Sequence, residues 1–96
     1  MYLLNVSYSQ SPQKVEPHVS GHSAWVKQHL QDGTFLFAGS KKSGLGGVIL
    51  VKSIPRKELQ IVLSEDSYVR AEVADYEVLD FDCKVVGPGL TALTGA

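Results

Sequence analysis

The order of the secondary-structure elements in this sequence predicts an α+β domain. Two segments repeat their apolar residues at helical spacing, and four shorter segments alternate or run apolar in the manner of β-strands. Their order along the chain is strand, helix, strand, strand, helix, strand, which is typical of the split βαβ, ferredoxin-like plait with a four-stranded antiparallel sheet. Two helices cover only one face of such a sheet, so we expect its other, apolar face to pack against a second copy of the chain.

The first strand and the first helix occupy residues 2 to 33. In Tyr2–Ser9 the apolar side chains alternate with a period of two, which predicts a strand. Ser11–Pro12 is a typical cap and first helical position, and the helix closes near Gly33 after an apolar stripe formed by Val15, Val19, Val26 and Leu30. Gly21 in the helix interior costs about 1 kcal/mol relative to alanine, so an early break or a start near Ser20 stays open.

Two central strands, a second helix and a last strand follow. Thr34–Ala38 and Gly47–Val51 are apolar on both alternating sides, and the glycine-rich segment between them suits a hairpin. The second helix is expected to begin at Pro55 and to run to Glu65, on a stripe formed by Leu59, Val62 and Leu63. Asp75–Cys83 alternates again and predicts the fourth strand.

The chain is expected to form one domain, residues 1–84, followed by a C-terminal tail, residues 85–96. Gly87-Pro88-Gly89 ends regular structure, because glycine and proline interrupt both helices and strands. We expect the tail to be either flexible or packed on the dimer partner.

Composition limits the classes of function. The 96-residue chain has 9 Lys and Arg against 10 Asp and Glu, a net charge of −1, so nucleic acid is not an expected partner. Its one cysteine, Cys83, cannot form an internal disulfide, which fits a reducing compartment. No apolar run approaches the roughly 18 residues of a membrane span and no basic leader precedes the first strand. We therefore expect a soluble, cytoplasmic protein with no membrane partner.

His22 lies on the apolar stripe of the first helix and is the leading candidate for a functional residue. Right-handed crossovers bring the start of the first helix, the end of the second helix and the hairpin to one end of the molecule. Asp66 follows the second helix, so we expect it beside His22. A carboxylate beside a histidine fixes its tautomer and raises its basicity, as a general base near neutral pH requires. The alternative is a core histidine whose hydrogen bonds are simply satisfied.

Four more residues are candidate substrate-binding groups at the same end of the molecule: Gly39, Ser40, Lys41 and Tyr68. Lys41 either binds an anion or belongs to a solvated loop. Tyr68 either donates to a substrate oxygen or closes the rim of the core.

The other two histidines, His18 and His29, are expected at the surface or at an edge. His18 and His22 have the one-turn spacing that two metal ligands on a helix require, but no third ligand is evident. The sequence therefore predicts neither a metal nor a cofactor.

Five segments of the chain carry a resemblance to a known family. They are the stretch from His22 through Trp25-Val26 to Gly33, then Phe35–Gly39, Gly46–Ile49, Asp66–Val69 and Tyr76–Val78. In their order and spacing they resemble the YciI-like (YCII-related) proteins, over nearly the whole chain to about Lys84. The resemblance implies a dimeric α/β barrel of ferredoxin-like plaits, related to muconolactone isomerase. It also implies a His–Asp pair as the active site, here His22 and Asp66.

Two functions from different classes remain. The first is a small lyase or isomerase in which His22 moves a proton on a small anionic or aromatic substrate and Asp66 orients the imidazole. The second is a non-catalytic dimeric module that binds a metabolite or another protein through the same pocket. The presence of both His22 and Asp66 favours chemistry.

Overall fold

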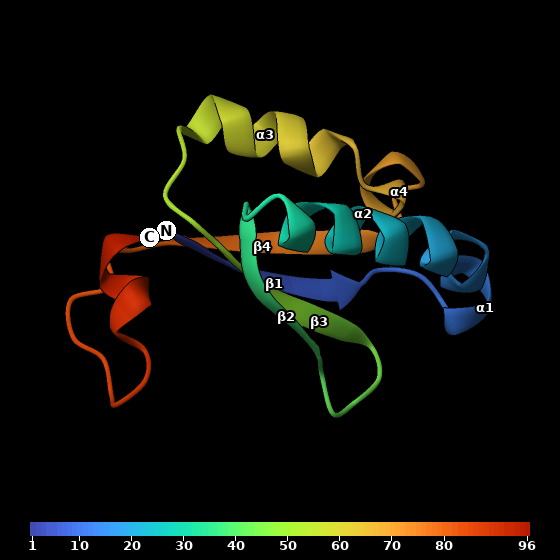
Figure 1. The fold of residues 1–96 in the computed structure, drawn as a ribbon. Coiled ribbons are helices and arrows are strands. Elements are labelled where there is room, and N and C mark those ends of the chain that lie inside the picture. The colour runs from blue at the N-terminus through green and yellow to red at the C-terminus, as the bar shows by residue number, and fades with distance from the viewer.

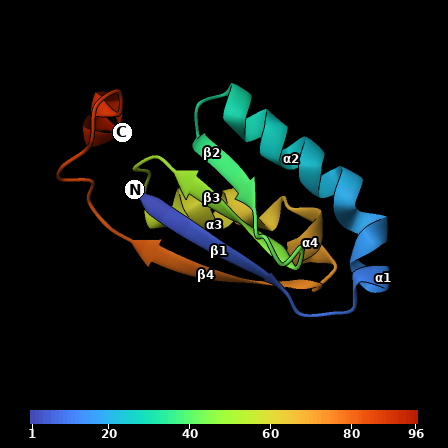
Figure 2. The same cartoon turned by 90° about the horizontal axis from the view of Figure 1, so that it is seen from below.

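The computed structural model describes residues 1–96 and has the predicted α+β architecture. Its strands are β1 (Tyr2–Tyr8), β2 (Phe35–Ser40), β3 (Gly46–Val51) and β4 (Ala74–Asp80). They form one antiparallel sheet in the order β2-β3-β1-β4, and the long helices cover one face of it (Figures 1 and 2). The predicted plait is confirmed. The largest difference in strand bounds is at the end of β4, which was expected at Cys83.

The first predicted helix is interrupted, and the second is followed by a further short one. α1 (Pro12–Val15) and a 3-10 turn, η1 (Glu16–His18), precede the long helix α2 (Val19–Gln31). Pro17 lies within η1 and accounts for the interruption, because proline lacks the N–H of a helical ladder and its ring crowds the preceding turn. The observed start of α2 is therefore close to the alternative start near Ser20. The second predicted helix is α3 (Arg56–Ser64), and the four-residue α4 (Ser67–Arg70), too short to show a helical period, was not predicted.

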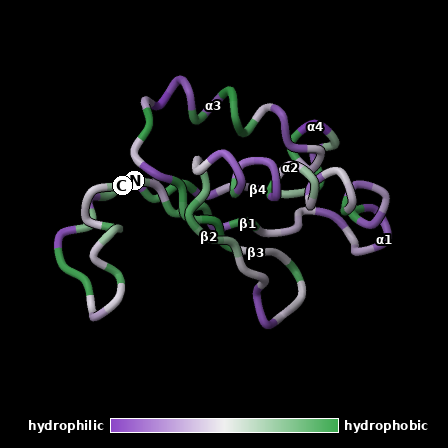
Figure 3. Tube along the Cα trace, in the orientation of Figure 1, coloured by the Kyte–Doolittle hydropathy of each residue, from purple (hydrophilic) through white to green (hydrophobic).

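The hydrophobic core lies between the helices and the covered face of the sheet. β1 supplies every second side chain to it, as its alternating pattern predicts, and the buried cluster consists of Tyr2, Leu4, Val6, Trp25, Phe35, Ile49, Val51, Leu59 and Val62. Burying each large apolar side chain stabilises the fold by roughly 1.5–3 kcal/mol. Hydrophobic residues are accordingly concentrated along the strands, and hydrophilic ones on the hairpin tip (Figure 3).

The opposite face of the sheet carries a second apolar row. Strand register places Phe37 opposite Leu50, Leu50 opposite Leu3, and Leu3 opposite Leu79, so the row crosses all four strands. Its two outer members, Phe37 and Leu79, are 48% and 57% exposed. Beside the row, the side-chain oxygen Oδ1 of Asn5 is shielded from solvent and has no hydrogen-bond donor. No helix covers this face (Figure 1).

His29 is buried and does not lie at the surface as the sequence suggested. Its ring packs between Trp25 and Phe35, with centroid separations of 5.9 and 5.0 Å. Nε2 lies 2.9 Å from Oε1 of Glu65, and Nδ1 lies 3.1 Å from Oδ2 of Asp32. The expectation failed because Glu65, the C-cap residue of α3 that contacts the ring, is 36 residues away in the sequence.

The end of the chain folds back towards the start of β1. A 3-10 turn, η2 (Thr91–Gly95), forms within the segment expected to be a tail. The Ser53 hydroxyl donates to the backbone oxygen of Ala96 over 2.8 Å. No helix of the chain has both the length and the hydropathy to span a bilayer.

Gly46, at the start of β3, provides a test of the hairpin geometry. Its φ is +152°, and a Cβ there would overlap the carbonyl oxygen of Val6 on the neighbouring strand. We expect Gly46→Ala to lower the free energy of unfolding by about 3 kcal/mol, since both the strained backbone and the overlap must be relieved. The melting temperature would then fall by roughly 12–24 °C for a domain of this size.

Gly87→Ala is the matched control for this prediction, because a Cβ at Gly87 meets nothing within 4 Å and its φ is not positive. Its effect should stay within about 0.5 kcal/mol. Equal melting temperatures for the two variants would show that the hairpin tolerates a side chain at Gly46.

Candidate functional site

Three segments that are distant in sequence meet at one end of the molecule. They are the start of α2, the turn between α3 and α4, and the β2–β3 hairpin (Figures 1 and 2). The end of β1 is tied to the hairpin by a hydrogen bond of 3.0 Å from the Tyr8 N–H to the Leu45 carbonyl. It is also tied to the segment before β4, because the Ser9 N–H donates to the Val73 carbonyl over 2.9 Å. The convergence predicted from the crossovers is confirmed.

At this end His22 and Asp66 lie within hydrogen-bonding distance, as expected. Nδ1 of His22 is 2.8 Å from Oδ1 of Asp66. The Asp66 side chain is completely buried, whereas the His22 side chain is 18% exposed. An ionised carboxylate only accepts hydrogen bonds, so Nδ1 carries the proton in this pair and Nε2 of the neutral ring keeps its lone pair.

Asp66 is held in place by more than His22. It is the N-cap of α4, where its Oδ1 accepts from the Tyr68 N–H over 3.2 Å. Its other oxygen, Oδ2, accepts from the hydroxyl of Tyr76 on β4. Both oxygens of the buried carboxylate therefore have donors, which offsets the cost of removing the group from water.

Close contact between α2 and α4 brings the pair together. A Cβ at Gly21 would lie 3.2 Å from both Cβ and Oγ of Ser67, so glycine gives α4 the space to approach. Ser67 also donates its hydroxyl proton to the His18 carbonyl over 2.8 Å. A glycine inside a helix, which propensity alone disfavours, is thus explained by packing one residue before His22.

Tyr68 lies behind the imidazole of His22. The two rings stack with centroids 3.9 Å apart and an interplanar angle of 5°. The Tyr68 hydroxyl is 3.5 Å from that of Tyr8. Burial and the hydrogen bond to Tyr8 raise the pKa of Tyr68, so it remains a neutral phenol and supports the imidazole from one side.

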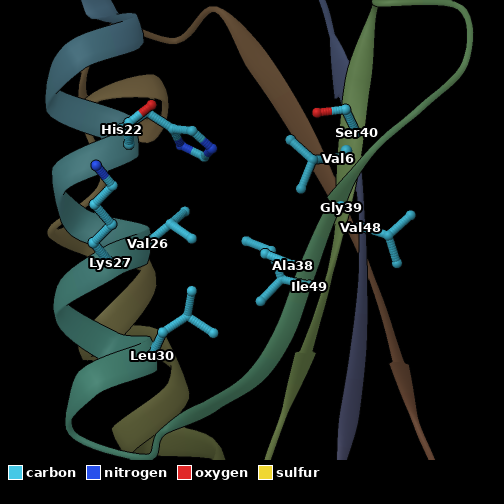
Figure 4. A pocket seen from close by; sticks show the side chains of 12 residues that line it. Val6, His22, Val26, Lys27, Leu30, Ala38, Gly39, Ser40, Val48 and Ile49 are labelled. Atoms are coloured by element: carbon cyan, nitrogen blue, oxygen red, sulfur yellow. The ribbon is translucent and has the colours of Figure 1, made fainter.

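A cleft of about 340 Å³ opens beside His22, between α2 and the β2–β3 hairpin (Figure 4). Its interior is mainly apolar and is formed by Val6, Val26, Leu30, Ala38 and Ile49. The imidazole of His22 points into the space from α2, and the Ser40 side chain lies across from it on β2 (Figure 4). No carboxylate lines the cleft, whereas Lys27 does. A volume near the lower limit of small-molecule sites suits a compact ligand.

The candidate substrate-binding residues divide into two groups. Ser40 and Gly39 line the cleft. Lys41 and Tyr68 do not: Lys41 donates from Nζ to the Ser7 hydroxyl over 2.8 Å, and Tyr68 is covered by His22. Lys27 was missed, although it follows the apolar-stripe residue Val26 on the helix that carries His22. Tyr76 was missed as a partner of Asp66, because strand alternation marks it only as a residue facing the core.

No group of three His, Cys, Asp or Glu side chains is placed to hold a metal ion. The ring of His22 is instead hydrogen-bonded to one carboxylate at Nδ1 and faces an open cleft. This arrangement suits a group that accepts and returns a proton.

Comparison with solved structures finds the same fold in an enzyme. The chain superposes with a TM-score of 0.68 and 13% sequence identity on 5-chloro-2-hydroxyhydroquinone dehydrochlorinase (TftG) from Burkholderia phenoliruptrix AC1100, determined in complex with 2,5-dihydroxybenzoquinone. The match covers 85% of this chain and 94% of the dehydrochlorinase chain. No curated protein matches the chain by sequence.

Comparison with sequence families gives a match over most of the chain. The family described as the YCII-related domain covers residues 1–82, which includes all four strands and both members of the His–Asp pair. The chain therefore belongs to the YCII-related domain family.

Proposed function

We propose that this protein catalyses proton transfer on a small organic molecule, with lyase or isomerase chemistry, and that His22 is the catalytic acid–base. The main support is that the His22 imidazole contacts two different environments. Its Nδ1 is bound to the buried Asp66 over 2.8 Å, and the same ring lines an open cleft. A general base needs both an orienting partner and access to substrate. The family and the enzyme with the same fold agree with a catalytic protein.

In the proposed reaction Nε2 of His22 takes a proton from an acidic carbon or hydroxyl of the substrate. The imidazolium that forms is stabilised by the negative charge of Asp66, which is not itself protonated. The substrate anion then either receives the proton at another atom, which is isomerisation, or expels a leaving group, which is elimination. In this proposal the hydroxyl of Ser40, which lies across the cleft from His22, donates a hydrogen bond to an oxygen of that anion.

The cleft favours a small substrate that is flat or mostly apolar and becomes anionic on deprotonation. Its interior residues are aliphatic, which suits the face of a ring. No carboxylate lines the cleft, so its lining does not oppose a negative charge on the ligand. A hydroxyquinone is a suitable first probe, because the structurally similar dehydrochlorinase was determined with 2,5-dihydroxybenzoquinone.

The first test of this proposal is His22→Asn. The asparagine amide can still donate to Asp66 from about the position of Nδ1, whereas Nε2 is lost. We expect the variant to keep its fold. The rate at which it exchanges the ring protons of 2,5-dihydroxybenzoquinone with D2O should be about 10²–10⁴-fold lower than that of the parent. Exchange is followed by NMR, and folding by circular dichroism.

His18→Asn is the matched control, since the His18 side chain is neither a cleft-lining group nor a partner of Asp66. It should exchange at the parent rate. If the parent binds the probe or other small phenols and organic acids but accelerates no proton exchange in any of them, the non-catalytic binding module is the better description.

Asp66→Asn is also expected to lower the exchange rate, but for a different reason. The substitution removes the charge that stabilises the imidazolium while the amide keeps nearly the same shape. The exchange rate should fall by about 10²–10⁴, the full contribution of a positioned base, if His22 depends on this charge. A variant that exchanges at the parent rate would show that the buried carboxylate has only a structural role.

We further propose that two copies of the chain associate through the uncovered face of the sheet. The apolar row of Phe37, Leu50, Leu3 and Leu79 crosses this face, and its ends are largely exposed. Such a row on a domain this small favours an interface. The unpartnered Oδ1 of Asn5 lies beside the row, where a second chain could supply the missing donor.

Leu79→Glu tests this association. A charge placed on a buried apolar interface is costly, so we expect the parent to sediment as a dimer at micromolar concentration and the variant to dissociate at least about tenfold more readily. Ile61→Glu is the control, because Ile61 is similarly exposed, at 62%, but lies on α3 above the other face of the sheet. A parent protein that sediments only as a monomer would contradict the proposal.

A further inference from the structure

Asp66 depends on a donor from the sheet as well as on donors from the helices. Its Oδ1 accepts from Nδ1 of His22 on α2 and from the Tyr68 N–H of α4, over 2.8 and 3.2 Å. The remaining oxygen, Oδ2, has the hydroxyl of Tyr76 as its hydrogen-bond donor. The carboxylate is completely buried, so no water competes for this position.

The Tyr76 hydroxyl determines how the carboxylate is turned. The torsion that rotates a carboxylate about its Cβ–Cγ bond is soft, so donors on one oxygen alone leave the plane of the group poorly defined. A donor on Oδ2 fixes that plane and directs Oδ1 at the imidazole. Tyr76 comes from β4, where it is paired with Val6 of β1. The sheet therefore orients a group that the helices also hold.

The chemical state of Tyr76 suits this role. Burial and the hydrogen bond to the Asp66 carboxylate raise the pKa of Tyr76, so the phenol keeps its proton and always donates. Its ring packs against the main core cluster and does not line the cleft beside His22. Tyr76 can therefore act on a substrate only through Asp66 and His22.

We propose that Tyr76 is a positioning residue for the His22–Asp66 pair, and that its hydroxyl holds the Asp66 carboxylate so that His22 keeps its proton on Nδ1 and presents Nε2 to the cleft. The inference rests on the proposed function for its catalytic meaning. Its geometry is tested on the protein alone, without any substrate.

The experiment is NMR of the full chain with ¹⁵N-labelled histidine, comparing the parent with Tyr76→Phe. The measured quantities are the tautomer of neutral His22 and the rate at which its Nδ1 proton exchanges with water. In Tyr76→Phe the carboxylate is free to turn, so the Nε2–H tautomer should become detectable and the Nδ1 proton should exchange at least roughly tenfold faster. If the Tyr76 hydroxyl only fills space, its loss should lower the melting temperature but leave the tautomer and the exchange rate of His22 at the parent values. That result would overturn the proposal.

Tyr8→Phe is the matched control. This substitution also removes a tyrosine hydroxyl near the pair. The Tyr8 hydroxyl, however, contacts that of Tyr68, at 3.5 Å, and not Asp66. The His22 tautomer and exchange rate should be those of the parent. A change as large as that of Tyr76→Phe would show that any disturbance of the aromatic cluster moves His22, and would remove the specific role of Tyr76.

A second variant decides the question if Tyr76→Phe does not fold. Replacing Tyr76 by 3-fluorotyrosine keeps the hydroxyl and makes it a stronger donor, so charge is drawn from Asp66 and its bond to His22 weakens. The Nδ1 proton resonance should then move to higher field with the tautomer unchanged. No movement would overturn the proposal. None of these results depends on whether the parent turns over a substrate, so failure of the proposed function and failure of this inference are seen separately.

Discussion

Helix α2 is joined to the second half of the chain by hydrogen bonds at three successive levels. His22 binds Asp66, the indole N–H of Trp25 donates to the Val62 carbonyl over 2.9 Å, and His29 binds Glu65. These residues of α2 are three and four positions apart, which places them on one face of the helix. Their partners all lie between the last turn of α3 and the cap of α4. These three contacts therefore hold α2 against this segment from His22 to His29.

This attachment explains why polar groups are tolerated next to the core. A buried carboxylate or imidazole without a partner costs more free energy than a marginally stable small domain can lose. Asp66 has donors from α2, α4 and β4, and both nitrogens of His29 face carboxylate oxygens. Once satisfied in this way, the groups have one arrangement. Such rigidity suits the proposed proton transfer, because a small error in the position of a general base costs a large part of its effect.

The two faces of the sheet have different roles. The covered face carries Tyr2, Leu4 and Val6 into the core and, through Tyr76 on β4, reaches the site. The uncovered face carries the apolar row that ends at Phe37 and Leu79. Because side chains alternate along a strand, each strand supplies both faces at once. The same alternation thus serves the site on one side and the proposed association of two chains on the other.

The sequence by itself determined the order of the four strands and the two long helices, the sheet topology and the residues His22 and Asp66, because these depend on local periodicity and on the handedness of crossovers. It did not determine which groups complete the site. Tyr76 alternates into the core like any strand residue, and only the register of β4 against β1 brings its hydroxyl to Asp66. The sequence predicts His29 at the surface or at an edge, because the contact of its ring with Glu65 exists only in the folded chain. Lys41 belongs to the hairpin in sequence, but in the folded chain it binds Ser7, and Lys27 lines the cleft instead. Each of these outcomes depends on a contact between residues far apart in the chain, which local propensity does not encode and which tertiary packing alone decides.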